Sequence, residues 1–133
     1  MIELACCFGM GPVGVPAIAE KQGISAKYIH LLMAGLKSAG LVRSVRGPGG
    51  GYELARDPSD ITALDIVSVL EGVFVPVECV VDDAFCLRVG YCTARSVWSS
   101  VASAMDGALS KLTLADLARK ELAARKEALT YHI

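Results

Sequence analysis

The chain has 133 residues, enough for one compact core but too few for two full-sized domains, so we expect one domain with an appendage. Hydrophobic residues make up 53% of the chain, yet proline and acidic residues interrupt every apolar run well before the roughly 18 residues of a membrane span. No membrane partner is therefore expected. Five cysteines, an odd number, and the absence of a signal-peptide pattern favour a reducing, cytoplasmic setting with free thiols or metal ligands rather than disulfides.

The net charge of −1 hides an uneven distribution. Residues 21–56 contain six basic residues and one acid, whereas residues 57–83 contain seven acids and no lysine or arginine. A basic segment beside an acidic one suits a surface that binds a polyanion. Uneven surface decoration explains the charges equally well, so the motifs must decide between these interpretations.

The N-terminal part predicts a helix-turn-helix. Residues 2–8 are apolar apart from one glutamate and indicate the end of a helix. A short helix over residues 15–22 ends at Gly23, and Ser25 is placed to cap a longer helix over residues 26–39. The apolar residues of this longer helix repeat at helical spacing, at Ile29, Leu32, Met33 and Leu36. Two helices joined by a three-residue turn form the helix-turn-helix motif.

A β-hairpin follows directly. Residues 41–46 and 52–56 alternate between apolar and polar side chains, and the Gly-Pro-Gly-Gly-Gly stretch at residues 47–51 separates them. A hairpin after the second helix converts the motif into its winged variant. The expected fold class is therefore mainly α with a small β-wing.

A capped helix and a loop come next. Thr62 begins a helix that runs through Glu71, with Asp65 completing a capping box. The apolar residues expected to face the core are Ile66, Val69 and Leu70. Residues 73–92 show no helical or strand period and contain three cysteines, so we expect a loop.

Two helices complete the chain. Residues 93–112 carry an apolar stripe, formed by Val97, Val101, Met105, Ala108 and Leu112 with Trp98 beside it, which predicts a long amphipathic helix. Thr113 and Asp116 form a second capping box that opens a charged terminal helix. We therefore divide the chain into a winged helix-turn-helix at 1–72, a cysteine-bearing loop at 73–92, and two helices at 93–133.

The helix at 26–39 and the hairpin together suggest a double-stranded DNA partner. The exposed N-terminal residues of such a helix can enter a major groove, while Arg46 beside the glycine-rich tip can enter a narrow minor groove. The candidate DNA-contacting residues are Ser25, Lys27, Tyr28, His30, Arg43, Ser44, Arg46, Gly47, Pro48, Gly49 and Gly50. A solvated helix or a flexible turn explains either feature alone. No catalytic constellation is present in the sequence, so we expect no enzyme.

The three loop cysteines are Cys79, Cys86 and Cys92. Their spacing lacks the close Cys pairs of zinc sites, while three thiolates in one loop suit an iron-sulfur cluster. Thiol redox sensing and plain buried cysteines remain as alternatives at this point. Cys6 and Cys7 lie on a short apolar helix and are interpreted as core residues.

Residues 18–25 (Ile-Ala-Glu-Lys-Gln-Gly-Ile-Ser) and 36–52, which include Arg-Gly-Pro-Gly-Gly-Gly-Tyr, resemble the Rrf2 family of bacterial winged-helix regulators, which includes IscR, NsrR and CymR. The resemblance continues through residues 64–72, the three loop cysteines, Trp98 and residues 113–117. It implies a homodimeric repressor in which residues 93–112 form the dimerisation helix. It also implies that the three loop cysteines bind an iron-sulfur cluster, [2Fe-2S] rather than [4Fe-4S].

Three departures from the family pattern limit what the resemblance implies. Members usually carry most of a first helix before the residues with which this chain begins, so the first helix is expected to be truncated. Arg95 stands where IscR has a histidine ligand, which leaves the fourth ligand to solvent, a small molecule or an acid such as Glu3 from a partner chain. His30 stands where many members have glutamate, so the operator sequence cannot be copied from IscR.

The family also contains members without a cluster that respond through thiols or a partner enzyme. A cluster-free regulator of the same fold is therefore the main alternative. A small metalloenzyme or redox protein, and a protein-interaction module on a DNA-binding scaffold, are more distant ones.

Overall fold

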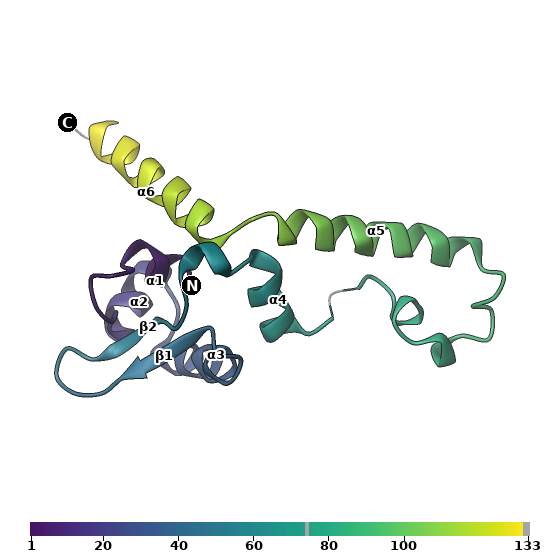
Figure 1. Cartoon of the computed structure of the whole chain (residues 1–133), viewed down its shortest axis with the longest axis horizontal. Coiled ribbons are helices and arrows are strands. Elements are labelled where there is room, and N and C mark those ends of the chain that lie inside the picture. Colours follow the sequence, from purple (N-terminus) through teal and green to yellow (C-terminus); the bar gives the residue numbers. More distant parts are fainter. Residues whose placement is uncertain (74, 132–133) are drawn as a thin grey trace.

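The computed structural model describes residues 1–73 and 75–131. The α-helices of this part are α1 (Ile2–Cys6), α2 (Val15–Gln22), α3 (Ala26–Ser38), α4 (Ala63–Glu71), α5 (Thr93–Ser110) and α6 (Leu114–Tyr131). The strands are β1 (Val42–Val45) and β2 (Gly51–Leu54), and short 3-10 turns are η1 (Pro58–Asp60), η2 (Glu78–Val80) and η3 (Asp83–Phe85). The prediction of a mainly helical fold with a small β-wing is confirmed (Figure 1).

The helix-turn-helix forms for the local reasons that the sequence suggests. Gly23 ends α2 in the left-handed conformation, with a φ of 64° that glycine adopts without steric cost. The Ser25 hydroxyl then accepts a hydrogen bond from the Tyr28 backbone N–H and caps α3. The buried residues of α3 are Ile29, Met33 and Leu36, so one face of this helix lies in the core.

The wing is a two-stranded antiparallel sheet that pairs Val42 with Leu54 at its base and Val45 with Gly51 at its tip. Val13 forms an isolated antiparallel β-bridge to β2, because its backbone exchanges hydrogen bonds of 2.8 and 3.0 Å with Tyr52. A Cβ atom on Gly51 would lie 2.1 Å from the Val13 carbonyl oxygen, and one on Gly50 would lie 2.3 Å from that of Val45. These two glycines are therefore required by the sheet itself, independently of any contact with DNA.

A single apolar cluster holds the N-terminal elements and the start of α6 together. It includes Leu4 of α1, Ile18 of α2, Ile29 of α3, Leu54 of β2, and Ile61, Leu114 and Ala118. Helix α6 thus packs against α1 and η1 rather than along α5. The division of the chain at residues 72 and 92 stays a prediction. Helix α6, from the third predicted segment, contributes Leu114 and Ala118 to the core of the first.

Helix α4 has the expected cap, because the Thr62 hydroxyl and the Asp65 carboxylate each accept a hydrogen bond from the other residue's backbone N–H. Ile66 and Val69 pack against the core as predicted. The placement of Leu70 in the core was wrong, since this side chain is 37% exposed. Helix α4 packs on α3 and α5 with no fully buried residue, and Leu70 lines an open apolar pocket beside Ile66 and core residues of α3.

The elements that share the apolar cluster, α1 to α4, the wing and the start of α6, form a compact unit. Helix α5 extends away from this compact unit, as Figure 1 shows, and the loop that contains η2 and η3 lies beside the distant end of this helix. At the near end, a short β-bridge between Thr62 and Thr113 joins the start of α4 to the α5–α6 junction. Its hydrogen bonds are 2.8 Å from the Ala63 N–H to the Leu112 carbonyl and 2.7 Å from the Leu114 N–H to the Ile61 carbonyl. The bridge joins the α5–α6 junction to the start of α4, in addition to the packing of α5 on α4 and of α6 on α1 and η1.

None of the helices within residues 1–73 and 75–131 is long and apolar enough to cross a membrane.

Candidate DNA-binding surface and cysteine loop

The outer face of α3 carries polar and apolar groups that remain free for a partner. Lys27 is exposed, and the exposed fractions of Tyr28 and Leu31 are 50% and 68%. The Ser25 hydroxyl, by contrast, is engaged in capping the helix. Lys27, Tyr28 and Leu31 are therefore exposed on the first turns of α3.

Two hydrogen bonds join α3 to the wing. The His30 Nδ1 atom lies 3.1 Å from the Tyr52 hydroxyl, and the Lys37 Nζ atom donates to the Ser44 hydroxyl at 2.9 Å. His30 and Lys37 are seven residues apart, which is about two helical turns, so both lie on the face of α3 that meets the sheet. These bonds hold the helix and the wing in a fixed relative orientation.

The wing carries two arginines with different surroundings. Arg43 on β1 pairs with Glu53 on β2 across the sheet, with 2.7 Å between Nε and Oε1. Arg46 lies beyond β1 at the exposed tip, next to Gly47, Pro48 and Gly49. Part of the charge of Arg43 is therefore offset within the wing, and Arg46 is the cation best placed to reach another molecule.

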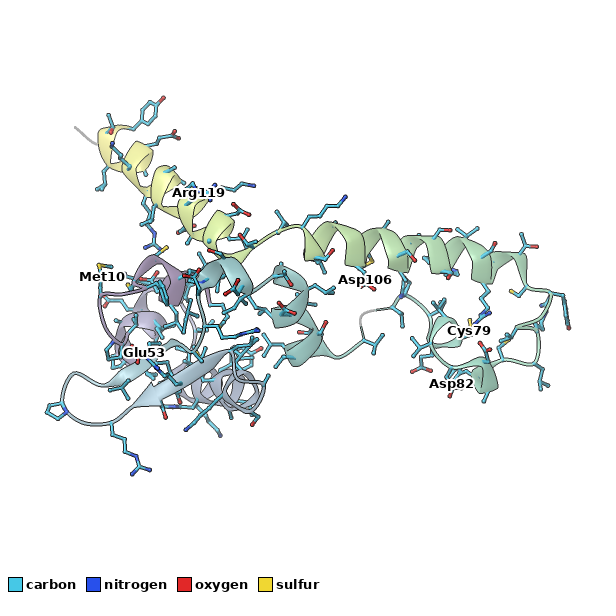
Figure 2. All side chains as sticks on the ribbon, viewed as in Figure 1. Met10, Glu53, Cys79, Asp82, Asp106 and Arg119 are labelled. Atoms are coloured by element: carbon cyan, nitrogen blue, oxygen red, sulfur yellow. The ribbon has the colours of Figure 1, made fainter. Side chains whose placement is uncertain are left out.

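The three loop cysteines lie at structurally distinct positions near the start of α5. Cys79 is in η2, Cys86 directly follows η3, and Cys92 is the N-cap residue of α5. All three are partly exposed. Figure 2 shows Cys79 beside the first part of α5, away from the wing.

Arg95 fastens this loop to α5. Its Nε atom donates a 2.8 Å hydrogen bond to the Cys79 carbonyl oxygen, and its Nη2 atom pairs with the Asp83 carboxylate. The guanidinium thus contacts the backbone of one cysteine and an acid of the next turn. Arg95, which stands where IscR has a histidine ligand, therefore connects the loop to α5 through a hydrogen bond and an ion pair.

The described residues contain no group of three or more histidine, cysteine, aspartate or glutamate side chains close enough to hold one metal ion. The three loop cysteines therefore share a segment without forming a preassembled metal site. As arranged here they do not fit a cluster, and the loop would have to draw its thiols together to ligate one.

Glu3 and the two N-terminal cysteines lie in the compact unit. The Glu3 side chain is only 3% exposed and forms ion pairs with Lys21 of α2 and Arg125 of α6. Burial alone would raise the pKa of Glu3, but the hydrogen bonds and charges of these two cations hold it below its ordinary value. The suggestion that Glu3 ligates a cluster in a partner chain was wrong, because its carboxylate is buried and already paired.

Cys6 packs against the core, and burial raises the pKa of its thiol. The prediction of a core position is therefore confirmed for Cys6. Cys7 is half-buried and lies outside the apolar cluster, so the same interpretation was wrong for Cys7.

Helix α5 exposes most of the stripe that the sequence indicates. Val97 is 57% exposed, Trp98 41% and Val101 37%, while Met105 and Leu112 are half-buried. Ala102 is the one buried residue of this 18-residue helix. An exposed apolar stripe on a helix that extends from a small unit is typical of a protein–protein interface.

Sequence reasoning missed Tyr52, Lys37 and Leu31. The helical spacing of His30 and Lys37 could have indicated that both face the wing, and the position of Leu31 outside the stripe could have indicated its exposure. No local pattern indicates that the Tyr52 hydroxyl reaches α3, since Tyr52 and His30 are 22 residues apart.

Comparisons with known proteins agree with this arrangement. A family model described as "Rrf2: Iron-dependent Transcriptional regulator" matches residues 1–120. The chain is 40% identical to the protein rrf2 of Nitratidesulfovibrio vulgaris strain Hildenborough over 119 residues, which are 90% of this chain and 79% of that protein. It is 41% identical over 118 residues to the HTH-type transcriptional regulator CymR of Bacillus subtilis strain 168, which covers 89% of this chain and 80% of that regulator.

Solved structures of regulators from the same family are also similar to this chain. The structure of B. subtilis CymR, described as the global cysteine regulator, aligns with a TM-score of 0.77 at 39% identity, over 90% of this chain and 87% of that one. The structure of T. potens IscR aligns with a TM-score of 0.73 at 41% identity, over 90% and 78%. The relatives of known role are named as regulators and not as enzymes. The chain therefore belongs to the Rrf2 family of transcriptional regulators.

Proposed function

We propose that this DNA-binding regulator acts as a homodimeric repressor in which α3 enters the major groove and the wing tip enters the adjacent minor groove. The observation that carries the proposal is the pair of hydrogen bonds that fixes α3 to the wing, because a rigid unit can engage both grooves in one register. Lys27 and Arg46, exposed on the two elements, supply the positive charge. The remaining candidate contacts stay as the sequence indicates: Ser25, Tyr28, His30, Arg43, Ser44, Gly47, Pro48, Gly49 and Gly50.

Leu31 adds an apolar contact to this surface. Its side chain is 68% exposed on α3, next to Tyr28 one turn earlier. An apolar side chain in the major groove recognises the methyl group of thymine. The surface therefore combines charge for affinity with an apolar group and His30 for base discrimination.

The dimer is proposed to form through α5. A second copy of the chain can cover Val97, Trp98 and Val101 by packing its own α5 against them, which gives a two-fold interface. The two winged helix-turn-helix units would then bind the two halves of a palindromic operator.

Helix α5 also offers a path from the cysteine loop to the DNA-binding surface. Arg95 connects the loop to the start of α5, and the Thr62–Thr113 bridge connects the end of α5 to α4, which packs on α3. A change in the order of the loop can therefore alter the angle at which α5 leaves the compact unit. Such a change in angle would alter the spacing of two recognition helices in a dimer.

The signal is proposed to be an iron-sulfur cluster, [2Fe-2S] rather than [4Fe-4S], ligated by Cys79, Cys86 and Cys92. The support is the chemistry of three partly exposed thiols in one segment and the iron dependence named in the family description. The cost is a rearrangement of η2 and η3, because the described arrangement holds no group of three ligands.

A cluster-free regulator that responds through the same thiols is the second candidate. The unassembled cysteines favour it, as does the likeness to CymR, which is described as a cysteine regulator. In this case Cys79, Cys86 and Cys92 would be oxidised or modified singly, without a metal.

Iron and sulfide analysis after anaerobic reconstitution separates the two candidates. The cluster proposal expects visible absorbance and iron in the wild-type protein and a loss of both in Cys79→Ala, Cys86→Ala and Cys92→Ala. Cys7→Ala is the matched control and should keep the wild-type spectrum. A colourless wild type, or three loop variants that keep its spectrum, would contradict the cluster and favour the thiol regulator.

DNA binding is tested on a selected operator by fluorescence anisotropy at fixed salt. Arg46→Ala should weaken binding by about 1 to 3 kcal/mol, because it removes a direct groove contact. Lys126→Ala, which removes an exposed cation from α6, serves as the control and should bind like the wild type. Equal affinity of wild type and Arg46→Ala would contradict the placement of the wing in a groove.

A further inference from the structure

The backbone of Tyr52 is held in the wing at the proposed DNA-binding surface. It exchanges two hydrogen bonds with Val13 and pairs with Ser44 across the wing. From this fixed base the phenol hydroxyl reaches α3 and lies 3.1 Å from Nδ1 of His30. The two rings also meet edge to face, with 6.0 Å between their centroids and 63° between their planes.

The chemistry of the two groups assigns the hydrogen in this bond. A phenol is a strong donor, and the unprotonated nitrogen of a neutral imidazole is a strong acceptor. Among the described residues, the Tyr52 hydroxyl has no other hydrogen-bond partner to which it could donate. The favourable arrangement is therefore Tyr52 O–H donating to Nδ1, which leaves the ring hydrogen of His30 on Nε2.

The Nε2 atom is then left for a ligand. His30 is an exposed residue of α3, and within the described part of the chain Nε2 takes part in no hydrogen bond. When the ring is protonated, Nε2 still carries a hydrogen. This atom is thus a hydrogen-bond donor in both protonation states, as long as Tyr52 occupies Nδ1.

We propose that Tyr52 is a positioning residue that holds His30 in the Nε2–H form, so that this position of α3 selects guanine in the major groove. Guanine presents two acceptors there, N7 and O6, whereas adenine presents one acceptor beside the N6 donor, thymine one acceptor beside its methyl group, and cytosine a donor. A carboxylate at the same position would accept hydrogen bonds and favour cytosine instead. The guanine preference rests on the proposed binding of α3 in the major groove, whereas the state of the imidazole does not.

The state of His30 can be measured in the free protein by nitrogen-15 NMR of the imidazole at alkaline pH. The chain has two histidines, so the His30→Ala variant identifies the signals of His30. The expected result is a hydrogen on Nε2 in the wild type and a mixture of tautomers in Tyr52→Phe, which keeps the ring contact but lacks the hydroxyl. A hydrogen on Nδ1 in the wild type, or an unchanged tautomer in Tyr52→Phe, would overturn the proposal.

Base preference is measured by selecting binding sites from a randomised DNA pool with the wild type, His30→Ala, Tyr52→Phe and the control Tyr91→Phe. His30→Ala should lose one guanine preference of about tenfold, and Tyr52→Phe should reduce the same preference by about threefold or more. Tyr91 lies in the cysteine loop and its variant should select wild-type sites. A structural role of Tyr52 alone would lower the melting temperature of Tyr52→Phe and leave the selected sites unchanged, which would overturn the proposal.

The two experiments separate this proposal from the proposed function. A wild type that selects no DNA sequence would contradict the placement of α3 and the guanine preference, even where the tautomer depends on Tyr52. If the wild type selects sites, but His30→Ala and Tyr52→Phe change no base preference, only the guanine preference is contradicted.

Discussion

The compact unit and helix α5 differ in how they bury their apolar residues. Every buried apolar residue in the described part of the chain belongs to one cluster of the compact unit, with the exception of Ala102. Helix α5 instead exposes Val97, Trp98 and Val101, and it packs mainly on α4 and on the loop that contains η2 and η3. The compact unit buries its apolar cluster within one chain, whereas α5 and the loop beside it have much of their apolar surface uncovered.

This difference indicates where the molecule can respond to its surroundings. A packed core has one arrangement and resists change, because close-packed side chains cannot shift singly. Helix α5 packs only on α4 and the loop beside it and joins the rest of the described chain through a short bridge, so we expect it to change its angle at a smaller cost in free energy. We expect the compact unit to determine stability, and α5 with its loop to determine assembly and signal response.

The largest effect is expected from a charge placed in the exposed stripe of α5. Val101→Asp should convert the proposed dimer into a monomer, because an unpaired carboxylate buried in the interface costs about 3 to 5 kcal/mol. Light scattering at micromolar concentration measures the change. Ser103→Asp is the matched control, since residues two apart lie on nearly opposite faces of a helix, and this variant should remain a dimer.

A wild type that is monomeric at this concentration would contradict the assignment of α5 as an interface. A monomeric Ser103→Asp would show that a charge anywhere on the helix disrupts assembly. The comparison between the two regions would then lose its main support.

A smaller effect is expected within the compact unit from the two faces of α3. Ile29→Ala should lower the free energy of unfolding by about 2 to 5 kcal/mol, because it leaves a cavity at a side chain that is 1% exposed. Leu31→Ala, on the same helix, should change it by less than about 0.5 kcal/mol, since Leu31 is exposed. Urea unfolding at one protein concentration measures both. Similar losses in the two variants would contradict the assignment of Leu31 to the DNA-facing side.

The smallest effect in this series concerns the ion pairs that join α6 to the compact unit. Glu3→Gln should lower the free energy of unfolding at neutral pH by about 1 to 3 kcal/mol, because it removes the charge between Lys21 and Arg125. These partners are 50% and 36% exposed, and solvent screens their charges, so the loss should stay below that of a fully buried pair. Glu121→Gln, which alters only the exposed end of the network, should have little effect.

The sign of the pH dependence follows from the lowered pKa of Glu3. A carboxylate whose pKa is lower in the folded state stabilises the fold above its ordinary pKa, and this contribution is lost as the pH falls through the folded value. The difference between wild type and Glu3→Gln should therefore shrink on acidification, as urea titrations at several pH values can show. A difference that grows as the pH falls would contradict the ion-pair interpretation.

Much of the fold could be predicted, because the patterns that indicate its helices and strands involve residues close together in the chain. The caps at Ser25, Thr62 and Thr113 form where the sequence indicates them, since each involves residues three apart. The wing strands shift by only a residue or two from their expected bounds, because Gly51 joins β2 through its pairing with Val45. The candidate DNA-binding residues were found from the same patterns, and their roles remain predictions.

Leu70 and Glu3 show where such patterns fail. Helical spacing places Leu70 on the apolar side of α4, but there it lines an open pocket and stays 37% exposed instead of joining the packed core. Glu3 looks like a free acid in the sequence, yet Arg125 lies 122 residues away along the chain and pairs with it.

The sequence by itself determined the helix-turn-helix, the wing and the presence of three cysteines in one loop, because hydrogen-bonded caps, turns and side-chain periodicity depend on residues close together in the chain. Only the tertiary structure decided that Tyr52 bonds to His30, that Arg95 fastens Cys79 to α5, and that α6 returns to α1. These contacts depend on the path of the backbone between distant segments. That path is set by the burial of the whole apolar cluster, which no local pattern contains.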